Sequence, residues 1–394
     1  MHHFRFLGLH DRLQLVQVFA VVGAGNEAAG VDRRELEMVL GRVRADHVER
    51  LGGESQRVDE VRRRGTTGAC DEDAPHLRSG GMARRALVTG VGGQDGSYLA
   101  ELLLGHGYEV FGTALSSPEG LPDAVQLVDD APAAIRELKP DETYHLASAS
   151  FVPASWEDPV GTARFAAESA AALLDMLRRE HPGGRFLNAA SAEMFGIPRE
   201  TPQTEETPIA PITPYGAGKA FAHFLAGAFR RRYGLHASSA ILFNHESPRR
   251  SPQFVTRKVS RGAAAISLGL EQELPLGDLS AERDWGFAGD YVRAMWLIAQ
   301  AGEPDDYVVA TAKAHSVEEL VAAAFEHVGL DWREYVRYDQ SLSRGGAEAP
   351  ALLGDPTKIR QRLGWQPEVG FEQLVALLVE ADLEELRAQM ASAR

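Results

Sequence analysis

Short apolar runs alternate with stretches of helical periodicity through most of the chain beyond residue 85. The first run, residues 86–89, is of strand type, and the leucines within residues 97–106 recur on one face of a predicted helix. A second strand is predicted over residues 109–113. The pattern therefore predicts a strand, a glycine-containing turn, a helix and a second strand at the start of the folded region.

The same alternation continues downstream and indicates the fold class. The next predicted elements are a strand at 125–128, a helix at 131–138, a strand at 142–146, a helix at 159–178 and a strand at 185–189. Strands that alternate with helices form a parallel sheet, because each helix returns the chain across one face of the sheet. We predict an α/β fold: a Rossmann-type doubly wound parallel sheet with a smaller C-terminal α/β substrate-binding domain.

Three regions follow from these patterns. Residues 1–81 are predicted to be an N-terminal extension in which residues 31–51 show helical spacing. Residues 82–245 are the predicted NAD(P)-binding Rossmann domain, and residues 246–390 are mainly substrate-binding, with 277–312 partly returning to the Rossmann sheet. Because Met82 lies just before the first strand, we expect translation to start there. Intact-mass analysis of the protein from its native host checks this, and a species that carries residues 1–81 would contradict it.

Composition and charge exclude several classes of partner. The formal net charge of −15 disfavours nucleic acid or an anionic membrane, since either partner needs a basic surface. Cys70 is the only cysteine, so no intrachain disulfide can form and a reducing, cytoplasmic location is expected. No run of about 18 apolar residues is present, so no membrane span is expected.

The glycine turn carries the first candidate chemistry. Gly90, Gly93 and Gly96 have the spacing GxxGxxG and surround Gln94 and Asp95. Glycines at these positions permit a tight turn and close approach of backbone N–H groups to a pyrophosphate at a helix N-terminus. A glycine-rich turn without a ligand is the alternative, and the α/β alternation that follows disfavours it.

The end of the second strand leaves the choice of dinucleotide open. An acidic residue there would bind the ribose hydroxyls of NAD, and an arginine would bind the 2′-phosphate of NADP. Residues 113–117, TALSS, contain neither. We expect NADP, with NAD as the alternative, and no metal.

Four residues form a candidate catalytic group. Ser191 follows the strand at 185–189, and Tyr215 and Lys219 are four residues apart, on one face of a predicted helix. A nearby ammonium lowers the pKa of a phenol toward the range of a general base, and Ser191 can hydrogen-bond the substrate hydroxyl. Glu193 lies two residues beyond Ser191, and its carboxylate can remove the acidic proton next to a ketone. The alternative for Glu193 is a loop cap or an ion pair with a lysine.

These motifs resemble the extended short-chain dehydrogenase/reductase family, and more narrowly its GDP-mannose 4,6-dehydratase branch. The resemblance spans residues 85–382, and its segments are TGVGGQDGSYLAELLLGHGYEVFGT, PDETYHLASASFVPASW, ASAEMFG, TPYGAGKAFAH, ILFNHESPRR, FVTRKVSRGAAAI, GDLSAERDWGFAGDYVRAMW and LLGDPTKIRQRLGW. FNHESPRR, taken with RDWG, is the most specific of them.

The resemblance implies a role for each matched residue. The implied cofactor contacts are Gly90, Gly93, Gln94, Asp95, Gly96, Leu146, Ala147, Tyr215 and Lys219. The implied substrate contacts are Asn244, Arg249, Lys258, Arg283, Arg344 and Glu348. Guanidinium groups in these segments, including those of Arg250 and Arg257, can clamp a diphosphate, although some of them can be surface ion pairs. The implied reaction converts GDP-mannose to GDP-4-keto-6-deoxymannose with internal return of the hydride.

Several departures from the family pattern keep alternatives open. The loop after the second strand is shortened to LSSPEGLPDA, which puts NADP preference and tetramer formation in doubt, so we expect a homodimer. LAS replaces the common LAA at residues 146–148, one residue is inserted between Arg344 and Glu348, and Pro350 stands where an acidic residue is usual. The alternatives are an NADPH-dependent GDP-4-keto-6-deoxymannose reductase, a 4-epimerase and a non-catalytic dinucleotide-sensing module. A non-catalytic sensing module is disfavoured, because it would normally have lost Tyr215 or Lys219 and this chain has both.

Overall fold

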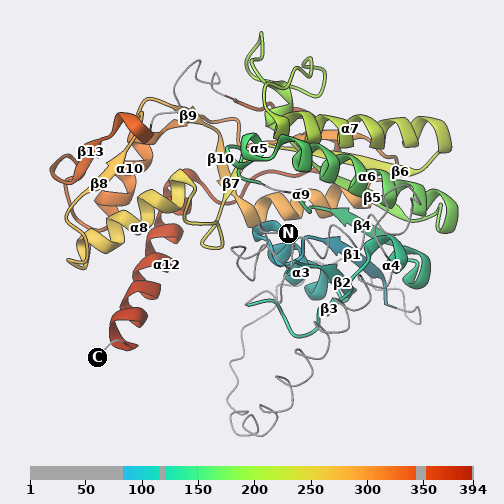
Figure 1. The fold of residues 1–394 in the computed structure, drawn as a ribbon, viewed down its shortest axis with the longest axis horizontal. Coiled ribbons are helices and arrows are strands. Elements are labelled where there is room, and N and C mark those ends of the chain that lie inside the picture. Colours follow the sequence, from blue (N-terminus) through green and yellow to red (C-terminus); the bar gives the residue numbers. More distant parts are fainter. Residues whose placement is uncertain (1–82, 116–119, 149, 343–351, 393–394) are drawn as a thin grey trace, which may run out of the picture. The chain divides into compact units, whose positions relative to one another are not determined.

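Seven parallel strands form the central sheet in the computed structural model of the protein (Figure 1). The structure describes residues 83–115, 120–148, 150–342 and 352–392. Across the sheet the strands are β11 (Asp306–Val309), β6 (His236–Leu242), β5 (Arg185–Ser191), β4 (Glu142–His145), β1 (Arg85–Thr89), β2 (Glu109–Thr113) and β3 (Gln126–Leu127). The predicted doubly wound parallel sheet is confirmed.

Helices cover both faces of this sheet. One face carries α3 (Gln94–Gly105) and α9 (Ala288–Gln300), and the other carries α4 (Ala131–Leu138), α6 (Pro159–Glu180) and α7 (Pro214–Tyr233). Successive side chains of a strand point to opposite faces. Accordingly, Val88 of β1 lies in the α3 and α9 core, whereas Leu87 lies in the core beneath α4 and α6.

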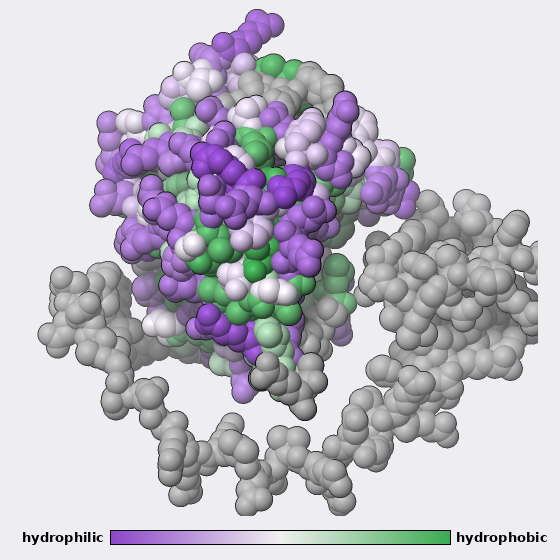
Figure 2. All heavy atoms as spheres, turned by 90° about the vertical axis from the view of Figure 1, so that its left-hand side faces the viewer, coloured by the Kyte–Doolittle hydropathy of each residue, from purple (hydrophilic) through white to green (hydrophobic). Residues whose placement is uncertain are grey.

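A smaller group of elements is built from the C-terminal part of the chain. It contains α8 (Val255–Ser267), α10 (Val317–His327), α12 (Phe371–Ser392) and β8 (Leu274–Leu276), which pairs with β13 (Val336–Tyr338). These elements share a separate hydrophobic core (Figure 1). On the face shown in Figure 2, hydrophobic side chains lie among hydrophilic ones.

Short elements complete the described chain. Two small pairs are β7 (Asn244–Glu246) with β10 (Trp285–Phe287), and β9 (Glu282–Arg283) with β12 (His315–Ser316). The remaining helices are α5 (Ala154–Glu157), α11 (Thr357–Leu363) and the 3₁₀ turns η1 (Ala192–Phe195), η2 (Trp332–Glu334) and η3 (Gln340–Leu342). Among the described residues, no helix combines the length and apolarity needed to cross a membrane.

The predicted elements are present, with differences at their ends. Helix α3 begins at Gln94 instead of residue 97, because the extended Gly93 already serves as its N-cap. Strand β5 continues to Ser191 instead of residue 189, because Ala190 and Ser191 still pair with β6. Residues 288–300 form α9, which packs on the large sheet, and residues 306–309 form β11, which pairs with β6. The domain boundaries themselves stay a prediction, and residues 1–81, Met82 and Cys70 lie outside the described residues.

Candidate functional site

The glycine turn between β1 and α3 is shaped to admit a phosphate. Gly90 has a φ of +75°, and its N–H and that of Val91 both donate to the Thr113 carbonyl at the end of β2, at 2.9 and 3.0 Å. A Cβ on Gly96 would lie 2.3 Å from the Gly90 oxygen, so only glycine fits there. No side chain caps the N-terminus of α3 at Gly93. The turn therefore fits the pyrophosphate of a dinucleotide.

Gln94 and Asp95 join this turn to strand β7. The Gln94 amide donates to the His245 carbonyl at 3.1 Å and accepts from the Ser247 hydroxyl at 2.9 Å, while Asp95 pairs with His245 Nε2 at 2.9 Å. Both side chains are thus engaged by the protein itself. Their direct contact with a cofactor stays a prediction.

The contacts of His245 indicate a doubly protonated ring. Its Nδ1 lies 2.7 Å from the Phe243 carbonyl and its Nε2 lies 2.9 Å from the Asp95 carboxylate, so both nitrogens face acceptors. Burial opposes the charge, but Asp95 outweighs it and raises the pKa of His245. Burial likewise opposes ionisation of Asp95, and the imidazolium lowers its pKa to about 2. His245 belongs to the FNHESPRR segment, and the motif alone predicts no role for it.

Leu146 and Ala147 lie beside the end of β1, where the glycine turn begins, and their contact with a cofactor stays a prediction. The Thr89 hydroxyl oxygen accepts from both of their backbone N–H groups at 3.2 Å and lies 3.0 Å from His145 Nδ1. Since that oxygen already accepts twice, its own proton goes to His145, whose ring is neutral. Burial, with the Lys219 charge, lowers the pKa of His145 to about 3. Ala147 Cα would be 3.0 Å from a Cβ on Gly90.

The predicted catalytic residues meet where β5, η1 and α7 converge. Ser191 ends β5, and its hydroxyl accepts the Glu193 N–H at 3.2 Å. Tyr215 and Lys219 lie one turn apart on α7, with Lys219 Nζ 5.8 Å from the centre of the phenol ring. A Cβ on Gly216 would lie 2.5 Å from the backbone carbonyl oxygen of Glu193, so glycine permits α7 to approach η1 this closely.

The pKa of Tyr215 is raised, whereas the sequence predicts that the neighbouring ammonium of Lys219 lowers it. Burial raises the pKa of Tyr215 to about 12, and Glu193 adds to this, while a hydrogen bond from Ser191 and the charge of Arg250 act in the opposite direction. Lys219 donates to the Ala189 carbonyl at 2.7 Å, and burial lowers its pKa to about 8. Thus the charge of Arg250, predicted from the sequence only as one of several arginines that can clamp a diphosphate, also lowers the pKa of the candidate base.

Arg249 and Arg250 are adjacent in sequence and make different contacts. The Arg249 side chain packs against α3, where it donates to the Ser97 hydroxyl at 3.0 Å and forms an ion pair with Glu101 at 2.6 Å. Arg250 forms an ion pair with Glu246 at 3.2 Å and lies 3.5 Å above the Phe254 ring. The substrate role of Arg249 stays a prediction. Arg250 is the member of this arginine pair that is electrostatically coupled to Tyr215 and Asp95.

The other predicted substrate residues lie toward the C-terminal elements. Asn244 begins β7 and lies opposite Trp285 in the ladder with β10, and Arg283 of β9 lies opposite His315 in the ladder with β12. Lys258 is half-buried on α8. Arg344 and Glu348 lie outside the described residues. The structure therefore brings together the cofactor and catalytic residues more fully than the substrate residues.

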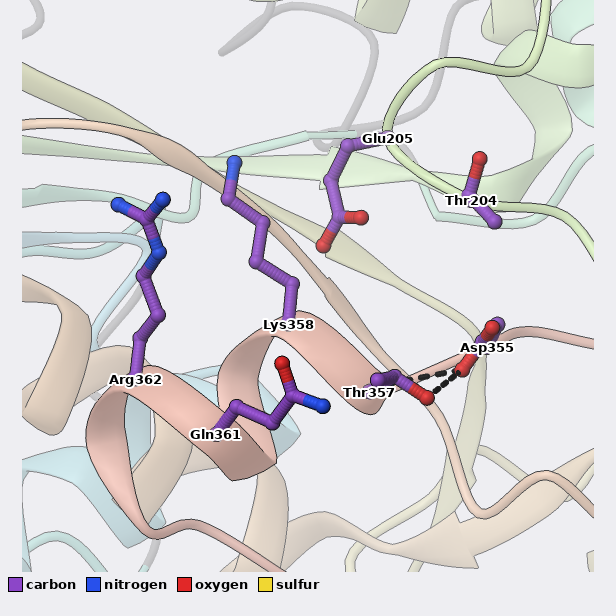
Figure 3. A pocket seen from close by; sticks show the side chains of 7 residues that line it. All are labelled: Thr204, Glu205, Asp355, Thr357, Lys358, Gln361 and Arg362. Atoms are coloured by element: carbon purple, nitrogen blue, oxygen red, sulfur yellow. Dashed lines mark hydrogen bonds between the residues drawn. The ribbon is translucent and has the colours of Figure 1, made fainter.

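A separate cavity of about 300 Å³ lies at the edge of the large sheet (Figure 3). Its lining comprises Thr204, Glu205, Asp355, Thr357, Lys358, Gln361 and Arg362, none of them a predicted site residue. Within it, Glu205 accepts the outward N–H of Val308 at 2.7 Å, and Lys358 donates to the Asp306 carbonyl at 2.8 Å. These side chains satisfy backbone groups of the edge strand β11, a common way of protecting an exposed edge.

Comparison with known proteins agrees with this arrangement. The family model described as GDP-mannose 4,6 dehydratase matches residues 87–128 and 121–378. GDP-mannose 4,6 dehydratase 2 of Arabidopsis thaliana is 46% identical over 325 residues, which are 76% of this chain and 87% of that protein. The human GDP-mannose 4,6 dehydratase is 39% identical over 350 residues, 77% of this chain and 92% of that protein.

A solved structure shares the fold. The dTDP-glucose 4,6-dehydratase of Streptomyces venezuelae, with NAD and TYD bound, superposes with a TM-score of 0.67 and is 26% identical, over 77% of this chain and 98% of that one. The family match, the sequence relatives and the fold point to one assignment. The chain belongs to the GDP-mannose 4,6-dehydratase family.

Proposed function

We propose that the protein is a hydro-lyase that converts GDP-mannose to GDP-4-keto-6-deoxymannose. The observation that carries this proposal is the meeting of Ser191, Glu193, Tyr215 and Lys219 at the carboxyl end of β5 and the start of α7. Glu193 favours dehydration in particular, since elimination needs a base for the C5 proton whereas 4-keto reduction and 4-epimerisation do not. The names of the sequence relatives support the substrate.

Each residue has a distinct part in the proposed reaction. Tyr215 accepts the proton of the 4-hydroxyl, which Ser191 holds by a hydrogen bond. A 4-ketone makes the C5 proton acidic; Glu193 removes this proton and passes it to the C6 hydroxyl, which leaves as water. The proton that Tyr215 took from the 4-hydroxyl is then delivered to C5, which restores its C–H bond. Lys219, fixed by the Ala189 carbonyl, positions its ammonium one helical turn from the phenol. When bound, the nicotinamide supplies the hydride acceptor for C4 and the donor for C6, so it is regenerated.

A nicotinamide dinucleotide fits the turn that Gly90, Gly93 and Gly96 form. We propose NADP, with NAD as the alternative, because residues 113–117 lack the acidic side chain that would repel a 2′-phosphate. Titration of the protein with NADP⁺ and NAD⁺ in parallel tests the choice. Tighter binding of NAD⁺ would contradict it. The cytoplasmic location stays a prediction, which cell fractionation tests.

Incubation of the purified protein with GDP-mannose and a catalytic amount of NADP⁺ tests the proposed function. We expect a product lighter than GDP-mannose by one water, with no net gain of NADPH, because the hydride returns to the sugar. A reductase would consume NADPH in proportion to a keto sugar, and an epimerase would give a product of unchanged mass. Either outcome, or no reaction with NADP⁺ bound, would refute the dehydratase proposal.

Apolar side chains on α6 and α7 support a homodimer. Val160 and Phe165 of α6 and Phe221 and Phe224 of α7 are exposed, Phe224 by 56%, and the two helices pack side by side. Burial of such residues against a second copy is favourable at about 25 cal/mol per Å². We therefore expect Phe224→Asp to shift the protein from dimer to monomer in light scattering. A monomeric wild-type protein would contradict the dimer.

A further inference from the structure

Glu246 is a buried carboxylate for which the reaction proposed above has no use. It ends β7, directly after His245, and its side chain is about 2% exposed. One oxygen, Oε2, accepts the Thr256 hydroxyl at 2.7 Å and pairs with Arg250 Nε at 3.2 Å. A buried carboxylate is costly unless it is paired and hydrogen-bonded, and these two partners meet that requirement.

The same contacts fix the Arg250 guanidinium on two sides. The Glu246 carboxylate forms an ion pair with its inner nitrogen Nε, which itself makes no hydrogen bond to a described residue, and the Arg250 guanidinium carbon lies 3.5 Å from the centre of the Phe254 ring. Among the residues that the structure describes, none accepts a hydrogen bond from the terminal nitrogens Nη1 and Nη2 of Arg250. The outer edge of the guanidinium is the part whose geometry matches the oxygens of a phosphate.

Arg250 also lies within electrostatic reach of the candidate site. Its positive charge lowers the pKa of Tyr215, the candidate base, and of Asp95, the carboxylate in the glycine turn. Backbone geometry ties this segment to the glycine turn: the Arg250 N–H donates to the Ser247 carbonyl at 2.9 Å, and the Ser247 hydroxyl donates to Gln94 of the turn at 2.9 Å.

We propose that Glu246 is a positioning residue: with Thr256 and Phe254 it holds the Arg250 guanidinium so that its terminal nitrogens bind a nucleotide diphosphate at the glycine turn. The inference rests on the proposed function, because the diphosphate belongs either to the dinucleotide cofactor or to the nucleotide sugar. Glu246 itself does not touch the ligand and acts through Arg250.

A second buried carboxylate, which likewise accepts a hydroxyl and pairs with an arginine, provides a matched control. Asp382 of α12 is fully buried, accepts the Ser260 hydroxyl at 2.6 Å and pairs with Arg257 at 2.8 Å. This group joins α12 to α8. Arg257 is buried, and besides Asp382 it also lies 3.9 Å from Glu385 of α12, so its charge is compensated by α12. We assign this second group to stability alone.

A double-mutant cycle on Glu246 and Arg250 tests the proposal, with NADP⁺ and GDP as the probes in separate calorimetric titrations. Glu246→Gln and Arg250→Met are each expected to lower the affinity for the same probe by about tenfold, the size of a lost hydrogen bond to a charged group. The double variant is expected to bind no more weakly than Arg250→Met, because Glu246 acts only through Arg250. The probe that loses affinity identifies which diphosphate Arg250 binds.

Three results would overturn the proposal. Additive effects in the cycle would show that Glu246 acts independently of Arg250. Unchanged affinity of Glu246→Gln for both probes would remove its role, and tighter binding would show that Glu246 only reduces the local positive charge. If Glu246→Gln fails to fold, Thr256→Val removes the hydroxyl that donates to Glu246 and is expected to lower the affinity for the same probe.

The control separates positioning from stability. Asp382→Asn is expected to lower the melting temperature and leave both affinities unchanged, and a loss of nucleotide affinity as large as that of Glu246→Gln would overturn the positioning role. Wild-type protein that binds neither NADP⁺ nor GDP would instead refute the proposed function. That outcome is distinct from a failed cycle in a protein that binds both.

Discussion

Replacement of Tyr215 by phenylalanine is expected to lower kcat for GDP-mannose dehydration by about 10³-fold, the usual contribution of a general base. The change removes one oxygen and leaves the ring that packs near Lys219 and Ser191. A phenylalanine at position 215 has no group that can accept the proton of the 4-hydroxyl. Steady-state assays of product formation check the expectation.

The affinity for the cofactor serves as the control for this variant. Lys219 keeps its hydrogen bond to the Ala189 carbonyl, and the glycine turn is untouched, so NADP⁺ should bind to Tyr215→Phe as to the wild type. A variant that retains more than about one tenth of the wild-type kcat would be inconsistent with Tyr215 as the base.

Replacement of Glu193 by glutamine is expected to lower dehydration by about 10²–10⁴-fold and to leave the oxidation at C4 intact. Glutamine is nearly isosteric but cannot remove the C5 proton. The negative charge of Glu193 raises the pKa of Tyr215, so its removal should lower that pKa and not impair Tyr215 as a base. We therefore expect enzyme-bound reduced nicotinamide to accumulate, which absorbance measurements detect in a single turnover.

Glu206→Gln is the matched control, because Glu206 is an exposed carboxylate in the segment after η1. It should turn over like the wild type. Retention of full activity by Glu193→Gln would remove Glu193 from the mechanism and would favour its alternative as a loop cap.

The fold was largely predictable because its signals are local. Apolar runs and helical periodicity define β1, α3 and β2, and the glycine spacing places the phosphate turn between them. The start of α3 was misplaced by three residues because an extended glycine, Gly93, serves as its N-cap, and glycine is a weak signal of a helix start. The end of β5 depends on pairing with β6, a contact between residues far apart in sequence.

The candidate site was predictable only in part, because side-chain direction depends on tertiary neighbours. Arg249 and Arg250 are equivalent in the sequence, yet the first lies on Tyr98 of α3 and the second on Phe254 at the start of α8. The raised pKa of His245 comes from Asp95, 150 residues earlier in the chain. Motif spacing predicts that the candidate catalytic residues Tyr215 and Lys219 share one helix, and α7 carries both.

Internal return of the hydride is the central claim of the proposed function. GDP-mannose that carries deuterium at C4 tests this claim most directly, with the position of the label in the product read by nuclear magnetic resonance. We predict that the deuterium appears in the C6 methyl group of GDP-4-keto-6-deoxymannose, with none in free NADPH. Deuterium that is found in NADPH, or that remains at C4 of the product, would contradict the dehydratase mechanism.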